Sequence, residues 1–337
     1  MQNQWFVGID ISQEQLDVAV FMDPHRCHYL TSTFHNNFSG FDKLKQWLEE
    51  NSIDPAQCVF CMENTGTYNL LLIHYMQMQN WWFCVENPHH LKKSIGLQRG
   101  KNDQVDAKRI AEYAFMSSHK LQRYQMPAKN LLKIKQLLTY RDHLVKTQTS
   151  FKNCVKSHNH YNTLTENTHI SEDIQHYIDD LREKINKTEK EIHKLINQDS
   201  GLKKTYDLAT SVTGIGHVLA SYLMVTTHNF LLFNDGRKYA CYVGVAPFEQ
   251  ESGKSLKGNT QVSPFGNKTV KSIFHNGVNS AIQHDPELKA YAQRKLNEGK
   301  HQMKVKNAAI NKIINRVFAT IKRGTPYVRF SPHNFAN

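Results

Sequence analysis

The stretch GKNDQVDAKR, residues 100–109, places two carboxylates, Asp103 and Asp106, among basic residues that include Lys101 and the preceding Arg99. Residues i and i+3 share one face of a helix, so both aspartates would point the same way if a helix opens here. Carboxylate oxygens are the ligands that Mg²⁺ prefers, and Lys and Arg are suited to phosphate. The segment therefore predicts a site where carboxylates hold metal and basic residues hold phosphate.

Two further acids stand at the ends of apolar runs that are typical of buried strands. Asp10 ends WFVGID, and Glu63 follows QCVFCM. If these strands are neighbours, both carboxylates emerge at the same edge of the sheet, and with Asp103 and Asp106 four acids from three elements can converge. Such a cluster would repel itself unless divalent cations neutralised it. Two ions roughly 3.5–4 Å apart can activate a nucleophile and stabilise the leaving oxygen in phosphoryl transfer.

Each acid also has an ordinary structural explanation. Asp10 could begin a turn, with Asp17 as a nearby competitor, and Glu63 could cap the helix that follows it. Asp103 could be a helix N-cap and Asp106 a first-turn acid that the helix dipole favours. The position of all four at the ends of elements, beside basic residues, favours a site.

Composition limits the class of protein and its partners. The 337 residues are 39% hydrophobic and 21% charged, which is ordinary for a soluble globular chain. Lys and Arg number 42 against 30 Asp and Glu, so the net charge is +12 and the pI is about 9.3. The excess makes nucleic acid the first candidate partner.

The sequence shows no targeting signal, and together with its cysteine usage this predicts a location in the cytoplasm. We find no secretory signal and no apolar run approaching the ~18 residues of a membrane span. The six cysteines are scattered, and the CxxC of Cys58 and Cys61 lies in an apolar run without a second pair to complete a zinc site. Free structural thiols in a reducing compartment are expected.

Strand and helix patterns alternate over residues 1–118, which predicts a mixed sheet with helices on its faces. Strands are expected at 5–10, 16–22, 29–35, 57–62 and 82–87, and helices at 41–50, in TYNLLLIHYMQMQ, and from near Asn102 to Ser117.

A heptad pattern marks residues 119–200. Its apolar seam in the second half is Ile174, Ile178, Leu181, Ile185, Thr188, Ile192 and Leu195, and the seam of an earlier partner helix is Leu137, Leu144 and Phe151. A bend is expected at 157–169. A hairpin that packs on itself and a coiled coil that joins two chains both fit this pattern.

Residues 201–337 are predicted to be mainly helical. DLATSVTGIGHVLASYLM reads as helix, Gly-x-Gly turn, helix, and the backbone N–H groups at Gly214 and Gly216 could face a phosphate. An ordinary helix–helix turn is the alternative, although Ile215 and Ala220 favour DNA binding. Residues 289–323 then contain ten Lys and Arg and one acid, Glu298, which suits phosphate contacts.

Several segments together resemble a known family. VGIDISQEQLDVAVF, CMENTGTYNLLL and GLQRGKNDQVDAKRIAEY are similar to the three blocks of the RuvC-like, RNase H-fold domain of Piv-type DNA invertases and related transposases. That group is the insertion-sequence family numbered 110, whose transposases are guided by a bridge RNA. TSVTGIGHVLASYL and YACYVGVAPFEQESGKSLKGNTQVSPFGNKTVKSIF resemble the family's C-terminal domain. The blocks keep their order over nearly the whole chain, and residues 119–200 match only through the helical hairpin.

The resemblance implies a fold and a division of the chain. It gives residues 1–118 an RNase H-like (RuvC-like) catalytic domain of the α/β class and residues 119–200 an antiparallel helical hairpin or coiled coil that dimerises. Residues 201–337 would form a mainly α transposase domain with a helix-hairpin-helix and a nucleophilic serine.

The resemblance also implies catalytic residues. The family's Asp-Glu-Asp-Asp set falls on Asp10, Glu63, Asp103 and Asp106, which would hold the metal. The nucleophilic serine falls on Ser252 in EQESGKS, where it would attack a DNA phosphate and form a covalent intermediate. The acidic set of the other domain would complete the site, since a serine hydroxyl is a weak nucleophile without a base or metal.

Residues around Ser252 suit this role, because Gly253 permits a close backbone approach. Lys254 and Lys257 can hold phosphate oxygens, and Ser255 is a competing nucleophile. The candidate nucleic-acid contacts are Arg99, Lys101, Gly214, Gly216, Lys254, Lys257, Lys268 and Lys271.

Partners and rival functions follow from the same comparison. The family implies Mg²⁺ with Mn²⁺ as its substitute, double-stranded donor and target DNA, a structured guide RNA, a homodimer or homotetramer, and the bacterial cytoplasm at the nucleoid. A metal-only RuvC-type nuclease is the first alternative. VGIDISQEQLDVAVF also resembles the phosphate motif of actin-like and sugar-kinase ATPases, but residues 200–260 offer no second phosphate loop. A non-catalytic binding module would explain the charge and not the four acids.

Overall fold

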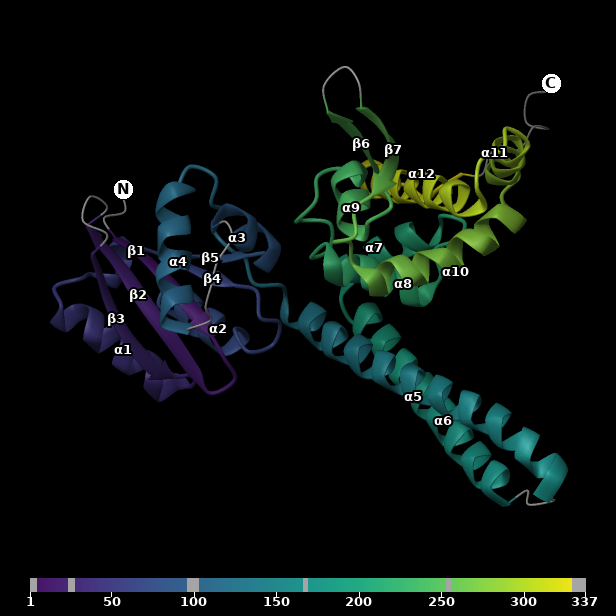
Figure 1. The fold of residues 1–337 in the computed structure, drawn as a ribbon, viewed down its shortest axis with the longest axis horizontal. Coiled ribbons are helices and arrows are strands. Elements are labelled where there is room, and N and C mark those ends of the chain that lie inside the picture. The colour runs from purple at the N-terminus through teal and green to yellow at the C-terminus, as the bar shows by residue number, and fades with distance from the viewer. Residues whose placement is uncertain (1–4, 24–27, 96–102, 166–168, 253–255, 329–337) are drawn as a thin grey trace. The chain divides into compact units, whose positions relative to one another are not determined.

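The computed structural model describes residues 5–23, 28–95, 103–165, 169–252 and 256–328. The chain divides into two compact units, unit 1 at Met1–Met126 and unit 2 at Pro127–Asn337, and each is treated by itself (Figure 1). Among the described residues, no helix combines the length and the apolar character that a membrane crossing requires.

Unit 1 is built on a five-stranded mixed sheet in the order β3-β2-β1-β4-β5. The strands are β1 (Trp5–Ile11), β2 (Gln15–Asp23), β3 (His28–His35), β4 (Cys58–Glu63) and β5 (Trp82–Glu86). β1, β2 and β3 form an antiparallel meander, whereas β4 and β5 run parallel to β1. All five expected strands are therefore present.

Helices cover both faces of this sheet. They are α1 (Phe38–Glu50), α2 (Leu70–Met78), α3 (Pro88–Ile95) and α4 (Asp103–Met116), with a short 3₁₀ turn, η1, at Pro55–Gln57. The sequence prediction did not include α3. The side chain of Asn37 caps α1 by accepting from the Gly40 N–H.

Alternation along the strands sorts side chains between the two faces. In β1, Val7 and Ile9 belong to the core that contains α1 and α2, whereas Phe6 packs with Ile110 of α4. Gly8 lies on the α4 face, and a Cβ there would sit 2.1 Å from the Ala107 oxygen, so α4 packs directly on the β1 backbone. Asp10 has the same parity as Gly8 and faces the same side of the sheet.

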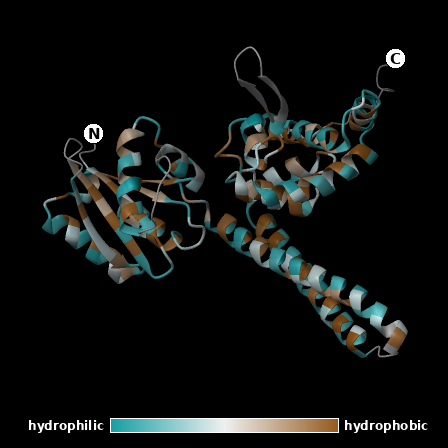
Figure 2. Ribbon diagram, viewed as in Figure 1, coloured by the Kyte–Doolittle hydropathy of each residue, from teal (hydrophilic) through white to brown (hydrophobic). Residues whose placement is uncertain are grey.

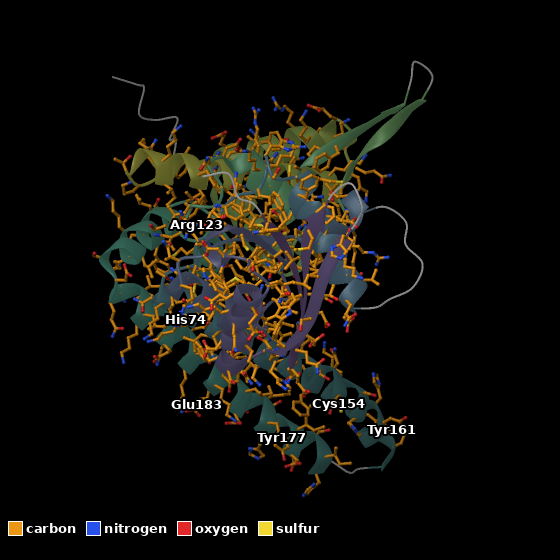
Figure 3. All side chains as sticks on the ribbon, turned by 90° about the vertical axis from the view of Figure 1, so that its left-hand side faces the viewer. His74, Arg123, Cys154, Tyr161, Tyr177 and Glu183 are labelled. Carbon is orange, nitrogen blue, oxygen red and sulfur yellow. The ribbon has the colours of Figure 1, made fainter. Side chains whose placement is uncertain are left out.

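Unit 2 begins with two long helices, α5 (Lys129–Thr165) and α6 (His169–Asn197), which lie side by side as a hairpin (Figure 1). In the seam of α6, Ile178, Ile185 and Ile192 are buried, as the heptad pattern predicts. Figure 3 labels Cys154, Tyr161 and Tyr177 on this hairpin. The Phe151 ring of α5 stacks on Tyr177 of α6 with centroids 5.7 Å apart.

The expected bend at 157–169 was wrong over 157–165, where α5 continues as a helix. The segment SHNHYNTLT is polar but contains neither Gly nor Pro. Polarity alone does not break a helix, since a solvent-facing turn needs no apolar side chains.

The rest of unit 2 is a helical domain with one hairpin of strands, and its hydrophobic and hydrophilic residues interleave along each helix (Figure 2). The helices are α7 (Ser200–Thr210), α8 (His217–Thr226), α9 (Gly236–Val243), α10 (Lys268–His284), α11 (Pro286–Asn297) and α12 (Gln302–Arg323). The strands, absent from the sequence prediction, are β6 (Pro247–Ser252) and β7 (Leu256–Val262).

Helix α12 is central to this domain. It buries Ile310, Ile313, Ile314 and Val317 completely and packs against α7, α9, α10 and α11. It ends at Gly324, whose φ of 73° is the left-handed conformation that glycine adopts most easily.

Candidate metal centre and nucleic-acid contacts

The ends of two neighbouring parallel strands position Asp10 and Glu63. Ile9 of β1 pairs with Met62 of β4, so the next residue on each strand, Asp10 and Glu63, meets at the same edge of the sheet. Glu63 has the same parity as Cys61, which packs with α4. Both carboxylates therefore belong to the α4 side of the sheet, as the strand patterns predict.

Helix α4 contributes the other two acids from its first turn. Asp103 and Asp106 are three positions apart in the helix and share a face. Because α4 packs so closely on Gly8, its amino end is fixed over the end of β1. One carboxylate oxygen from each of Asp10, Asp103 and Asp106 lies within 4.8 Å of the others. Glu63 stands outside this group of three, although its charge reaches Asp10.

Burial and the neighbouring negative charges both raise the pKa of Asp10. Burial raises the pKa of Asp10 to about 6, and the charges of Asp103, Asp106 and, more weakly, Glu63 act in the same direction. The Ile11 N–H donates to Asp10 Oδ1 at 3.1 Å and opposes the rise. The ionised cluster is therefore strained in the absence of a cation.

The donor set suits a hard divalent cation. All three clustered ligands are carboxylates, two are half-buried and Asp103 is exposed, so a cation could keep water ligands on the open side. Arg109 Nη1 donates to Asp106 Oδ1 at 2.7 Å, which leaves the other oxygen of Asp106 for a metal. The clustered acids thus indicate a divalent metal site.

One acid at this edge was missed by the sequence reasoning. Glu86 ends β5 and pairs with Glu63 in the sheet register. Burial raises the pKa of Glu86, while the charge of His90 and a hydrogen bond with Tyr113 lower it. The available signal was its place at the end of WFCVE, the same position that Asp10 and Glu63 hold in their strands.

The other predicted site residues differ in what the structure describes. Ser252 is the last residue of β6 and pairs with Leu256 of β7. The structure describes the backbones of Ser252 and Lys257 but not their side chains. Three further predicted residues lie wholly outside the described part of the chain: Arg99, Lys101 and Lys254.

The two predicted lysines of α10 have different surroundings. Lys268 begins the helix and is exposed. Lys271 Nζ donates to the Gly244 carbonyl at 2.8 Å, so it tethers α10 to the end of α9.

The predicted helix, Gly-x-Gly turn and helix are present as α7, residues 211–216 and α8. Gly214 has φ +93° and touches α10, since a Cβ there would lie 2.8 Å from the Gly277 oxygen. Gly216 is the N-cap of α8, and a Cβ there would meet nothing within 4 Å. Ile215 and Ala220 are buried in the core of unit 2, which anchors the turn.

The sheet and the acidic cluster together define an RNase H-like nuclease domain with a place for divalent metal. A family model for the DEDD domain of IS110 elements, described as a transposase, matches residues 7–159. A second model, described as transposase of the IS116/IS110/IS902 family, matches residues 206–293.

Known proteins resemble the chain over almost its full length. The pilin gene-inverting proteins of Moraxella bovis and Moraxella lacunata are each 26% identical over 333 residues, which is 96% of this chain and 97% of each relative. An uncharacterised 43.6 kDa protein of the insertion element IS110 from Streptomyces coelicolor is 28% identical over 118 residues, 35% of this chain and 29% of that protein. The chain belongs to the IS110 family of transposases, enzymes of DNA phosphoryl transfer.

Proposed function

We propose that this chain recombines DNA with Mg²⁺, or Mn²⁺ in its place, held by Asp10, Asp103 and Asp106 with Glu63 beside them. The clustering of three carboxylate oxygens within 4.8 Å is the observation that supports this most directly. When bound, the metal would supply charge neutralisation for a phosphoryl group and lower the pKa of an attacking hydroxyl.

The residues of the chain have distinct tasks in this proposal. Asp10 and Asp106 fix the ligand geometry from the sheet and from α4, because both backbones are held by the close contact at Gly8. Asp103, the exposed member, faces the side from which DNA would approach. Arg109 neutralises part of the charge on Asp106 and restrains that carboxylate through a 2.7 Å hydrogen bond.

Ser252 is proposed as the nucleophile of unit 2. Its oxygen would form a bond to a DNA phosphorus while the bond from that phosphorus to one strand breaks, and the leaving oxygen would take up a proton. Support comes from the position of Ser252 in the segment that the second transposase model matches. A hydroxyl needs an activating base or metal, so the proposal requires the acidic cluster of unit 1 for this step.

A metal-only nuclease is the second candidate, because the three clustered carboxylates all come from unit 1. Water would then attack the phosphate directly. Denaturing the protein after a trapped reaction separates the two: a covalent protein–DNA adduct supports serine attack, and free DNA ends support hydrolysis. Ser252→Ala should lose the adduct while Ser255→Ala retains it, and an adduct that survives in Ser252→Ala would exclude Ser252.

The proposed partners are double-stranded donor and target DNA, a structured guide RNA and further copies of the chain. Support is the net charge of +12 and the family assignment. The Moraxella relatives are named for gene inversion, which makes inversion a candidate reaction here as well. RNA that copurifies with the chain and matches DNA flanking its gene would support the guide, and strand exchange by RNA-free protein would contradict it.

A further inference from the structure

A groove of about 1050 Å³ in unit 2 runs between the amino end of α8, one face of α10 and part of α5. We propose that this groove binds the phosphodiester backbone of a nucleic acid. The inference rests on the proposed function and extends it to residues that the sequence pattern did not identify, Thr213 above all.

The floor of the groove is the turn before α8. Gly214 has a structural role, because its φ is positive and its backbone packs against α10. We therefore do not assign it a contact with the ligand. Gly216 is exposed, lines the groove and has open space where a side chain would be. As the N-cap of a ten-residue helix it has no side chain to accept from the first N–H groups, which leaves them to an anionic acceptor.

Thr213 provides an independent indication of a ligand. It lines the groove, it is only 8% exposed, and within the described part of the chain its hydroxyl Oγ1 has no hydrogen-bond partner. A buried hydroxyl without a partner costs free energy, and most buried polar groups of native proteins do have a hydrogen-bond partner. A phosphate oxygen bound at the amino end of α8 would supply the missing acceptor.

The α10 wall of the groove presents neutral hydrogen-bonding groups. Thr269, Ser272, Asn276 and Ser280 line it at helical spacing and are exposed. Hydroxyl and amide groups of this kind are common partners of nucleic-acid phosphates and sugars. A strand lying along α10 could meet one such group per helical turn.

The α5 wall adds charges of both signs. Arg141 pairs with Glu189 through a 2.6 Å contact from its Nε, and its Nη1 lies 4.0 Å from Asp142. Lys146 contributes a further positive charge one turn along α5. Asp142 and Glu189 equal Arg141 and Lys146 in number, so these four side chains carry no net charge. Lys146 is exposed and can contact one phosphate of an anionic strand.

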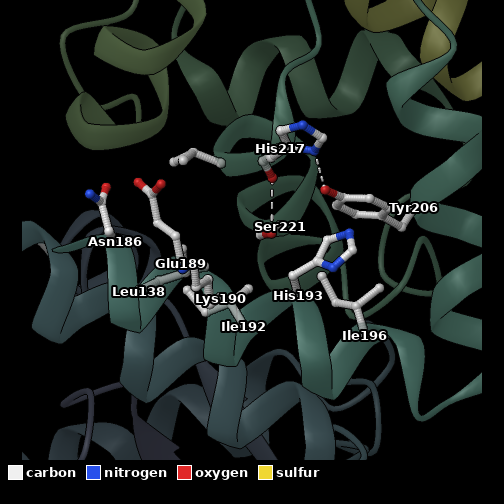
Figure 4. A pocket seen from close by; sticks show the side chains of 11 residues that line it. Leu138, Asn186, Glu189, Lys190, Ile192, His193, Ile196, Tyr206, His217 and Ser221 are labelled. Atoms are coloured by element: carbon white, nitrogen blue, oxygen red, sulfur yellow. Dashed lines mark hydrogen bonds between the residues drawn. The ribbon is translucent and has the colours of Figure 1, made fainter. Parts of the chain in front are cut away.

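Hydrogen bonds from residues that line a neighbouring pocket hold His217, the first residue of α8, in place. The pocket measures about 410 Å³, and His217 lines both it and the groove. Figure 4 shows the Tyr206 hydroxyl directed at His217, where it hydrogen-bonds Nδ1, and Ser221 Oγ donating to the His217 carbonyl at 3.0 Å. The amino end of α8 is thereby held in place before a ligand binds, which lowers the ordering cost of binding.

The test compares binding and stability in the full-length protein. Fluorescence anisotropy measures affinity for a labelled DNA duplex and, in a second arm, an RNA duplex of the same sequence, over a range of salt concentrations and with EDTA. Thr213→Val keeps the shape of the side chain and removes the hydroxyl. We expect it to weaken binding roughly tenfold, the value of one hydrogen bond to a charged group, while the unfolding midpoint stays equal or rises.

Two further variants sharpen the result. Gly216→Ala should fold normally, because φ −83° and ψ 173° suit any residue and nothing lies within 4 Å of the new methyl, yet it should weaken binding by obstructing the groove. Lys146→Ala should reduce the salt slope by about 0.9 for duplex DNA, whereas Thr213→Val should leave that slope unchanged.

Thr320→Val is the matched control. Thr320 is 1% exposed and donates to the Arg316 carbonyl within α12, so its loss should lower stability and leave binding intact. A loss confined to one arm assigns the groove to DNA or to RNA, and a loss in both assigns it to the backbone they share. The proposal that the groove binds phosphate is wrong if Thr213→Val binds both duplexes with wild-type affinity. It is also wrong if the variant loses affinity only to the extent that it loses stability. Failure of the wild-type chain to bind either probe would overturn the proposed function as well.

Discussion

Replacing Asp10 by Asn in the metal-free protein is expected to stabilise unit 1. Burial and the neighbouring acids raise the pKa of Asp10 from 3.8 to about 6, so ionising this carboxyl costs more in the folded than in the unfolded chain. At about 1.36 kcal/mol per pKa unit, the difference corresponds to about 3 kcal/mol. Solvent screens a half-buried group, and we therefore expect the variant to gain about 1–2 kcal/mol at neutral pH.

The pH dependence of this gain has a definite sign. A carboxyl with a raised folded-state pKa contributes its stability in full below the unfolded value of 3.8 and loses it as the pH rises through about 6. Asn cannot ionise, so the stability of the variant does not fall for this reason as the pH rises. The advantage of Asp10→Asn should therefore be small near pH 4 and complete above about pH 6.

Tryptophan fluorescence during urea unfolding with EDTA measures this effect in unit 1 alone. The chain has four Trp residues, and all of them lie in that unit: Trp5, Trp47, Trp81 and Trp82. Glu14→Gln, which removes an exposed carboxylate of the same unit, is the control and should change little. A variant no more stable than the wild type at neutral pH, or an advantage undiminished near pH 4, would refute the electrostatic reasoning.

Three other perturbations have expected outcomes. Adding Mn²⁺ to the same experiment should stabilise the wild type and not Asp10→Asn, because a metal stabilises only a fold that keeps its ligands, and equal shifts would contradict this. Gly8→Ala should cost about 3 kcal/mol or more in the fluorescence-detected unfolding, since its Cβ would sit 2.1 Å from the Ala107 oxygen, and a mild loss would mean that α4 can move. Arg316→Ala should lower the free energy of unfolding, measured by urea unfolding followed by helical circular dichroism, by about 3 kcal/mol. The substitution leaves the Asp285 carboxylate, which is 5% exposed and lies 2.8 Å from Arg316, buried without its cation. An unchanged free energy of unfolding would show that water solvates this carboxylate in the variant.

The positions of the acids were accessible from sequence because they depend on local patterns. Asp10 and Glu63 end apolar strands, and Asp103 with Asp106 has the spacing of one helix face. What the sequence left open was how closely the three elements approach. That distance depends on the register of β1 with β4, which joins residues about fifty positions apart, and on the contact of α4 with Gly8, which joins residues about a hundred positions apart.

Other features were missed because their signals are weak or non-local. The strands β6 and β7 are largely polar, with EQES and KGNTQ in place of an alternating apolar pattern, so nothing in the sequence distinguished them from a loop. The partner of Asp106, Arg109, lies on the same helix, yet its orientation depends on what surrounds α4. The Thr213 hydroxyl became notable only when its surroundings were known to lack a partner among the described residues.

The most direct test of the proposed metal centre is anomalous diffraction at the manganese edge from crystals of the full chain grown with Mn²⁺. We expect a peak about 2.1 Å from an oxygen of each of Asp10, Asp103 and Asp106, the distance of hard-cation coordination. Saturating Mn²⁺ that leaves this cluster without a peak, with the three carboxylates ordered, would contradict the assignment of a metal centre to these residues.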